Sequence, residues 1–197
     1  NAGYDFTSWL SFNYTFGWNQ YEMEREQVIN LGSAARSGLG YILDDTYKMQ
    51  ELESVFVLTF NKDFGTDYNL KASVGHNVNQ RTTHLNRRDG TGMIYKGIYN
   101  LDNTLSQTAR DEYSRRRLWA MFADVTFGYK NFLYLNASLR NDHSSTLPKD
   151  NNSYYYPAFT GSFVFTELLD MKQDILSFGK IRLGWGKVGN DASPYYK

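Results

Sequence analysis

The stretch "FLYLNASLRNDHSS", from Phe132 to Ser145, decides the fold class, because apolar and polar side chains alternate along it. The apolar positions are Leu133, Leu135, Ala137 and Leu139. The polar positions between and after them are Asn136, Ser138, Arg140 and Asp142. An alternation with a period of two predicts a β-strand with one apolar and one polar face. The architecture then depends on which face points to the inside of the molecule.

The same alternation recurs along the chain, so we predict an all-β protein with about seven long strands. Besides the opening stretch, the predicted strands are Tyr4–Trp18, Ser54–Lys62, Asn69–Gln80, Leu118–Tyr129, Tyr154–Thr166 and Lys180–Val188. Within Tyr4–Trp18 only Ser8 and Trp9 interrupt the pattern. Each predicted strand has about 9 to 14 residues, which exceeds the average for soluble domains.

The connections between the predicted strands alternate in length along most of the chain. Two are long, Asn19–Leu52 and Arg81–Arg115, and two are short, Asp63–Tyr68 and Gly128–Asn131. The last two, His143–Ser153 and Glu167–Gly179, are of medium length. In an antiparallel up-and-down meander this alternation places the long connections at one end, as in outer-membrane barrels with long extracellular loops and short periplasmic turns. Within the second long connection, Leu101–Arg117 could form a short helix or an irregular loop, and both alternatives stay open.

Composition narrows the function classes. Lys and Arg together number 21, and Asp and Glu together also number 21. The chain therefore has no net positive charge that would attract nucleic acid. The absence of cysteine removes disulfides, a thiolate nucleophile and cysteine-based metal sites. The first residues, "NAGYDFTSW", contain no initiator Met and no apolar signal region, so we expect a mature protein or a fragment.

Two architectures agree with the alternating strands. In a soluble β-sandwich the apolar face would be the core, whereas in a transmembrane β-barrel it would face lipid. Tilted membrane strands need about 9 to 11 residues, which favours the barrel. Aromatic side chains agree with this choice, because Tyr129, Phe132 and Tyr134 cluster at a short turn and Phe16 and Trp18 are expected at opposite strand ends. The side chains predicted to face a hydrated lumen are Asn136, Ser138, Arg140, Asp142 and Arg182.

No catalytic residue, metal site or cofactor is predicted. Asp142, His143, Ser144 and Ser145 contain the side chains of a hydrolytic triad, but consecutive extended residues point to opposite faces. The histidines, His76, His84 and His143, lack ligand spacing. A calcium ion in a loop is neither supported nor excluded by the sequence.

Three segments resemble SusC-like TonB-dependent transporters. "LTFNKDFGTDYNLKASVGH" (Leu58–His76) resembles a strand–turn–strand of that family. "YLNASLRNDHSSTLPKDNNSYYYPAFTGSFVFTE" (Tyr134–Glu167) resembles its Ala-Ser-Leu-Arg strand, Asn-rich hinge and aromatic-Pro corner, with His143 where Gly is frequent. "KIRLGWGKVGNDASPYY" (Lys180–Tyr196) is similar to its Leu-Arg strand ending in Gly-Asn, with Ile181 for the usual Leu. The three segments occur in the family's order.

The resemblance implies that residues 1–197 are a portion of the barrel of an outer-membrane active importer. It further implies a barrel of about twenty-two strands with a plug domain, a SusD-like surface lipoprotein as partner, and energy supplied through the TonB complex, which would bind a part outside this chain. It implies an oligosaccharide or, less commonly, a peptide as substrate. Aromatic side chains that could contact a sugar from loops are Tyr95, Tyr99, Tyr113, Tyr154, Tyr155 and Tyr156. The competing hypothesis is a soluble β-sandwich carbohydrate-binding module.

Overall fold

The computed structural model describes residues 1–169, 176 and 178–189. The described residues form one sheet of eight strands, which are neighbours in chain order from β1 to β8. The strands are β1 (Ala2–Thr7), β2 (Leu10–Ile29), β3 (Tyr41–Phe64), β4 (Tyr68–Met93), β5 (Thr104–Tyr129), β6 (Leu133–Ser144), β7 (Ser153–Phe163) and β8 (Ile181–Gly186). The short helical segments are η1 (Ala35–Gly38), η2 (Leu101–Asn103), η3 (Lys149–Asn151) and α1 (Phe165–Leu168).

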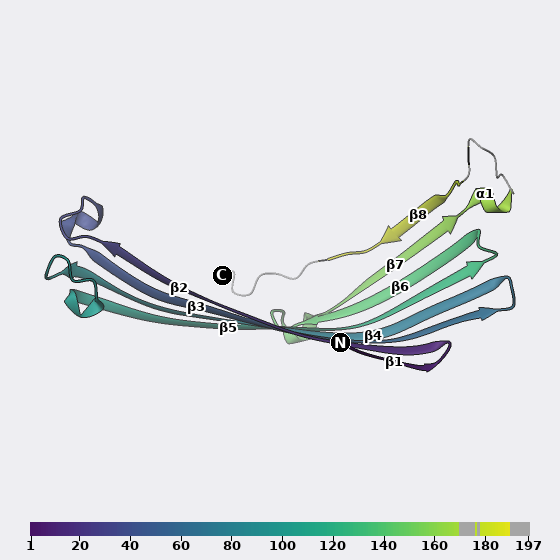
Figure 1. The fold of residues 1–197 in the computed structure, drawn as a ribbon, viewed down its shortest axis with the longest axis horizontal. Coiled ribbons are helices and arrows are strands. Elements are labelled where there is room, and N and C mark those ends of the chain that lie inside the picture. Colours follow the sequence, from purple (N-terminus) through teal and green to yellow (C-terminus); the bar gives the residue numbers. More distant parts are fainter. Residues whose placement is uncertain (170–175, 177, 190–197) are drawn as a thin grey trace. The chain divides into compact units, whose positions relative to one another are not determined.

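The sheet is an antiparallel meander, in which each strand pairs with the next strand in the sequence (Figure 1). This confirms the prediction of an all-β, up-and-down antiparallel fold. Parts of the predicted connection Glu167–Gly179 and the end of the Lys180–Tyr196 motif lie outside the described residues. Among the described residues, no helix has the length and apolar character that crossing a membrane requires.

The two segments predicted as long loops are mostly strand, so that prediction is wrong. Asn19–Leu52 and Arg81–Arg115 contain the far ends of β2, β3, β4 and β5, and only residues 30–40 and 94–103 connect them. Cross-strand pairs of polar side chains accompany the extended backbone, such as Lys48 with Glu22 at 3.0 Å. Polar residues predominate there in the sequence, so the apolar–polar period that identified the other strands is missing. β5 also begins at Thr104, so Leu101–Arg117 is neither a helix nor an irregular loop beyond η2.

The segment predicted as the first strand is a hairpin of two strands. β1 and β2 pair from Ala2 opposite Tyr14 to Thr7 opposite Leu10, and the chain turns at the two residues that interrupt the alternation. The sheet therefore has eight strands rather than about seven. Phe16 and Trp18 consequently lie inside β2, and their expected position at a strand end is wrong.

The turn between β5 and β6 explains why this hairpin is tight. Lys130 and Asn131 both have positive φ, 44° and 58°, and the Phe132 N–H donates to the Tyr129 carbonyl oxygen at 3.1 Å. Two central residues with positive φ form a type I′ turn, whose twist matches that of paired strands. The predicted short turn at Gly128–Asn131 is confirmed.

The chain divides into two compact units, which we describe separately. Unit 1 comprises Asn1–Gly17, Glu53–Asn79 and Arg116–Lys197, and unit 2 comprises Trp18–Leu52 and Gln80–Arg115. In the described part of unit 1 the buried apolar side chains are Ala120 and Val164. In unit 2 they are Tyr41, Ile42, Leu43 and Met93. Unit 2 thus has a small apolar core, whereas unit 1 has almost none.

Candidate functional site

Strands β5 to β8 in unit 1 place most of their large apolar side chains on one face. Directly paired residues of an antiparallel sheet share a face, and here Val125 pairs with Ala137, Ala137 with Phe159, and Phe159 with Trp185. This apolar face also carries Trp119, Met121, Phe127, Leu135, Leu139, Phe163, Ile181 and Leu183. Apart from Phe163, which is half-buried, its large side chains are exposed, from 37% for Phe127 to 75% for Leu183. A water-soluble sheet would bury such a face instead.

The opposite face of the same strands carries the paired polar side chains. The Asn136 amide donates to Asp124 at 2.8 Å and to Thr126 at 2.9 Å. Arg140 donates to Asp142 at 2.6 Å and to Asn77 on β4 at 3.4 Å. Along β6 the side chains on this polar face are half-buried, whereas Leu135 and Leu139 are exposed. The exposure pattern is therefore inverted relative to a soluble protein.

The five residues predicted to face a lumen share this polar face. Four of them alternate along β6, namely Asn136, Ser138, Arg140 and Asp142. Arg182 on β8 pairs with Ser162, which pairs in turn with Tyr134, and Tyr134 lies on the polar face of β6. The register thus brings the predicted set together on one face, and the lumen itself stays a prediction.

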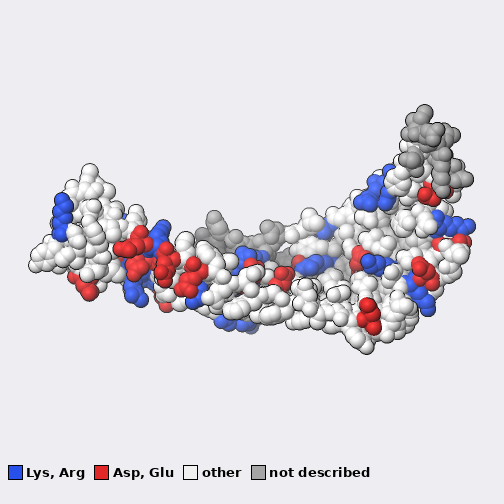
Figure 2. Space-filling view, viewed as in Figure 1, with Lys and Arg blue, Asp and Glu red and all other residues white. Residues whose placement is uncertain are grey.

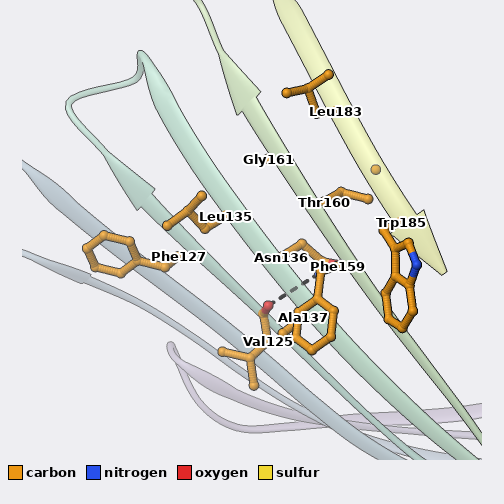
Figure 3. Close-up of a pocket in the computed structure, with 11 residues that line it drawn as sticks. Val125, Phe127, Leu135, Asn136, Ala137, Phe159, Thr160, Gly161, Leu183 and Trp185 are labelled. Atoms are coloured by element: carbon orange, nitrogen blue, oxygen red, sulfur yellow. Dashed lines mark hydrogen bonds between the residues drawn. The ribbon is translucent and has the colours of Figure 1, made fainter.

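A shallow hollow lies in the apolar face across β5 to β8 (Figure 3). Its volume is about 620 Å³, and the small residues Ala137 and Gly161 lie between larger side chains that line it. Among these, the rings of Phe159 and Trp185 stack with centroids 6.0 Å apart. The lining is almost entirely carbon, so the hollow suits an apolar neighbour such as a hydrocarbon chain.

Aromatic rings gather near the short turns of unit 1. The Tyr129 ring lies 5.3 Å from Phe132 and 5.1 Å from Tyr68, between ring centroids. The Lys130 ammonium lies 5.4 Å from the Tyr129 ring centroid, within cation–π range. The predicted grouping of Tyr129 with Phe132 is therefore confirmed. Rings with an ammonium beside them are typical of the boundary between apolar and polar surroundings.

The six tyrosines proposed as loop residues do not all lie in loops. Tyr95 and Tyr99 lie in the connection between β4 and η2, as predicted. Tyr113 lies inside β5, and Tyr154, Tyr155 and Tyr156 lie inside β7, so their loop placement is wrong. The strand that carries Tyr113 begins earlier than the period of two indicates, whereas Tyr154, Tyr155 and Tyr156 lie in a segment that the alternation already predicts as strand. Because Tyr154 pairs with Asp142 and Tyr155 pairs with Asn141, these two neighbours point to opposite faces.

The register separates the side chains that resemble a hydrolytic triad. Asp142 pairs with Ala120 and lies on the polar face, whereas His143 pairs with Trp119 on the apolar face. The Asp142 carboxylate accepts from Arg140, and the His143 ring stacks on Trp119 with centroids 3.8 Å apart. The described residues also contain no grouping of three or more His, Asp and Glu side chains suited to a metal ion.

Sequence reasoning missed a buried carboxylate in unit 2. Asp45 on β3 is 2% exposed and accepts hydrogen bonds from Arg25 on β2 and from Arg87 on β4. The hydrogen bond from Arg25, with help from Arg87, lowers the pKa of Asp45 below its ordinary value, although burial opposes this. The sequence predicts a loop for Asn19–Leu52, so its pattern does not indicate that these three side chains meet. On the face that Figure 2 shows, acidic and basic side chains are interspersed.

The comparisons with known proteins concern the fold. Neither a protein-family model nor a curated protein sequence matches the chain. The structure of the RagAB peptide transporter matches 91% of it with a TM-score of 0.82 and 16% sequence identity. The RagAB peptide importer in the closed-closed state matches 94% with a TM-score of 0.84 and 17% identity. The chain spans about a fifth of those matched chains, 21% in both cases, and at this identity the likeness establishes that it shares the fold of part of them.

Proposed function

We propose that this chain is a portion of the β-barrel of an outer-membrane active importer. The observation that carries the proposal is the exposed apolar face of unit 1, opposite a face of half-buried, hydrogen-bonded polar side chains. Lipid is the surrounding in which an exposed apolar sheet face is stable. The fold likeness to part of the RagAB peptide transporter supports the same assignment.

The finer assignment is to SusC-like TonB-dependent transporters. It rests on the three ordered motifs in Leu58–His76, Tyr134–Glu167 and Lys180–Tyr196, together with the fold likeness. In this proposal the polar face lines the barrel lumen, and the far ends of β2 to β5 in unit 2 lie on the extracellular side. The remaining strands, the plug and the TonB-contacting segment belong to the full-length protein. A SusD-like lipoprotein is the expected partner, and an oligosaccharide is the expected substrate.

The soluble β-sandwich hypothesis explains the observations less well. A sandwich needs a second sheet packed about 10 Å from the first, over its apolar face. The described residues form one sheet, and its apolar face has side chains such as Phe159 at 54% and Trp185 at 60% exposure. The sandwich hypothesis therefore leaves this face in water.

Single-cysteine labelling tests the orientation of the two faces, because residues 1–197 contain no cysteine, and any cysteine elsewhere in the full-length protein is first replaced by serine. We would place spin labels at Asn136, Ala137, Ser138 and Leu139, one at a time, in the full-length protein reconstituted in liposomes. We expect high accessibility to oxygen, which partitions into lipid, at Ala137 and Leu139. A water-soluble nickel chelate should instead reach Asn136 and Ser138. Equal accessibility to the nickel chelate at all four positions would contradict the membrane assignment.

Uptake measurements test the transport part of the proposal. Cells producing the full-length protein should take up a radiolabelled oligosaccharide, and a protonophore should abolish the uptake because the energy comes from a proton gradient. Uptake that persists in the presence of the protonophore would contradict active import. The labelling experiment would still decide the membrane assignment in that case.

A further inference from the structure

The apolar face of unit 1 ends at a row of three rings, His76 on β4, Trp119 on β5 and His143 on β6, which we call the ring row. The Trp119 ring stacks on His143 with centroids 3.8 Å apart and 7° between the planes, and its centroid lies 6.2 Å from that of His76. Trp119 and His143 pair at the end of the β5–β6 hairpin that is opposite the turn at Lys130–Asn131. Indole and imidazole rings suit a boundary between apolar and polar surroundings.

A carbon-lined hollow lies in the apolar face between the ring row and the turn. Its volume is about 320 Å³, and Val74, His76, Met121 and Leu139 are among its lining residues, all of which belong to unit 1. Met121 is 59% exposed and Leu139 is 46% exposed, so the hollow is open to the surroundings of the sheet. An open hollow with this lining suits a flexible hydrocarbon chain.

On the other side of the ring row, the next side chain of β5 on this face is Arg117. It lies two positions before Trp119 in the strand and is exposed, whereas its neighbour Arg116 is half-buried on the opposite face. The Ser145 N–H donates to the Arg117 carbonyl oxygen at 2.9 Å, and the Arg117 N–H donates to the Ser145 hydroxyl at 2.8 Å. These contacts continue the ladder one residue beyond the pair Leu118–Ser144 and fix the direction of Arg117.

The hollow, the ring row and Arg117 therefore follow one another along the strands in the order of the parts of a phospholipid. The run from Trp119 to Tyr129 matches the about 9 to 11 residues that a tilted strand needs to cross the hydrocarbon layer, so Arg117 would lie at the level of the headgroups. An arginine there can keep its stem on apolar surface and bind a phosphate through paired charge-assisted hydrogen bonds. Along β5 and β6, the apolar face carries no carboxylate between the ring row and the turn that would repel an anion.

We propose that this surface binds a phosphate-bearing lipid of the outer leaflet, with an acyl chain in the hollow and the phosphate on Arg117. The turn at Lys130–Asn131 lies on the periplasmic side in the proposed orientation, which assigns the ring row to the leaflet that faces the outside. A basic side chain beside apolar surface at a membrane boundary is the chemistry that recognises anionic headgroups. The inference rests on the proposed function, since it needs the apolar face in a bilayer, and goes beyond it by naming a lipid site.

Quenching by brominated lipids tests the site where it lies. A fluorescent label on Met121→Cys, in the otherwise cysteine-free full-length protein, reports which lipids contact the hollow. The bilayer is phosphatidylcholine with increasing amounts of either brominated phosphatidylcholine or brominated phosphatidic acid, which have the same acyl chains and differ in the headgroup. Phosphatidic acid should be enriched at the label about tenfold over phosphatidylcholine, the factor expected of one charge-assisted contact.

Variants of two adjacent arginines assign the enrichment to one side chain. Arg117→Gln should reduce it to within about twofold of phosphatidylcholine, because the phosphate loses its guanidinium. Arg117→Lys should keep part of it, since an ammonium still attracts phosphate as a point charge. The matched control is Arg116→Gln, which removes the same charge from the opposite face and should leave the enrichment unchanged.

The outcomes separate this inference from the proposed function. Equal quenching by the two brominated lipids, or equal losses for Arg116→Gln and Arg117→Gln, would overturn the lipid site and leave the barrel assignment standing. Removal of the enrichment by inorganic phosphate at constant ionic strength would also overturn it, because the site would then be one for free phosphate. Absence of quenching by either lipid would contradict the proposed function and the lipid site together, since the apolar face would then lie outside the bilayer.

Discussion

The two units of the sheet differ in where they place their large apolar side chains. In unit 1 the large apolar side chains are exposed, and the polar side chains opposite them are half-buried and hydrogen-bonded. Unit 2 instead buries Tyr41, Ile42, Leu43 and Met93, and it encloses the carboxylate of Asp45 between two arginines. The same continuous strands run through both units.

The difference is what the proposed function expects of a sheet that lies partly in lipid and partly in water. A surface that exposes Leu183 at 75% and Trp185 at 60% beside other large apolar side chains is costly in water and favourable in hydrocarbon. A surface built from Lys–Glu and Arg–Glu pairs is favourable in water. Each variant below changes one unit, and the Asn103→Ala variant also shows whether the other unit responds.

The largest effect should come from placing a charge on the apolar face of unit 1. In the proposed membrane orientation Leu139 lies near the middle of β6, so the Leu139→Arg variant of the full-length protein should lose about 2–4 kcal/mol, the cost of an arginine near the bilayer centre. Urea unfolding in liposomes measures the loss. The control is Ser138→Arg on the polar face of the same strand, and a loss as large as that of Leu139→Arg would contradict the difference between the faces.

The next effect should be confined to the loop of unit 2. The Asn103→Ala variant leaves the Tyr95 N–H and two carbonyl oxygens without their partner, at a cost of roughly 2 kcal/mol. Hydrogen exchange followed by mass spectrometry should show faster exchange in residues 94–103. Exchange in the β5–β6 hairpin of unit 1 should not change, and a change there would show that the units are coupled.

A smaller effect in unit 2 should depend on pH. The Asp45→Asn variant should open the neighbouring strand ends about tenfold more often at neutral pH, since Arg25 and Arg87 lose a charged acceptor. The folded pKa of Asp45 lies below its ordinary value of 3.8, so its contribution is present above that pH and disappears as the pH falls through the folded value. Protection factors of wild type and variant should therefore converge as the pH falls below 3.8 and through the lowered pKa of folded Asp45. Equal protection at pH 7 would contradict this role.

The smallest effect should come from the turn between β5 and β6. Asn131 has φ of 58°, which asparagine tolerates and a β-branched residue does not, so Asn131→Val should cost about 1 kcal/mol. Urea unfolding of the full-length protein is again the measurement. Asn131→Gly is the control and should be at least as stable as the wild type, because glycine adopts this conformation freely.

Much of the fold of unit 1 could be predicted from the sequence, because its strands have one apolar and one polar face. The period of two identified β6 and placed Asn136, Ser138, Arg140 and Asp142 on one side of it. The same alternation of apolar and polar residues predicts β8, in which Arg182 lies on the polar face. The break at Ser8 and Trp9 was visible, but a two-residue interruption does not distinguish an irregular strand from a turn.

Unit 2 could not be predicted in this way. Its strand ends are polar in sequence, so "NQYEMERE" (Asn19–Glu26) and "QRTTHLNRRD" (Gln80–Asp89) resemble loops even though ladder hydrogen bonds hold them as strands. The contact of Asp45 with Arg25 and Arg87 joins three strands and depends on the register of their pairing.

The meander order of the sheet has a consequence for how the protein assembles. Within the described sheet, strands pair only with their neighbours in chain order, so no pairing inside it must wait for a distant segment. The entropy lost in closing each hairpin is small, and the sheet can grow by adding one strand at a time to the last one formed. An error in one hairpin, such as a shifted register at Lys130–Asn131, would therefore be passed on to every strand added afterwards.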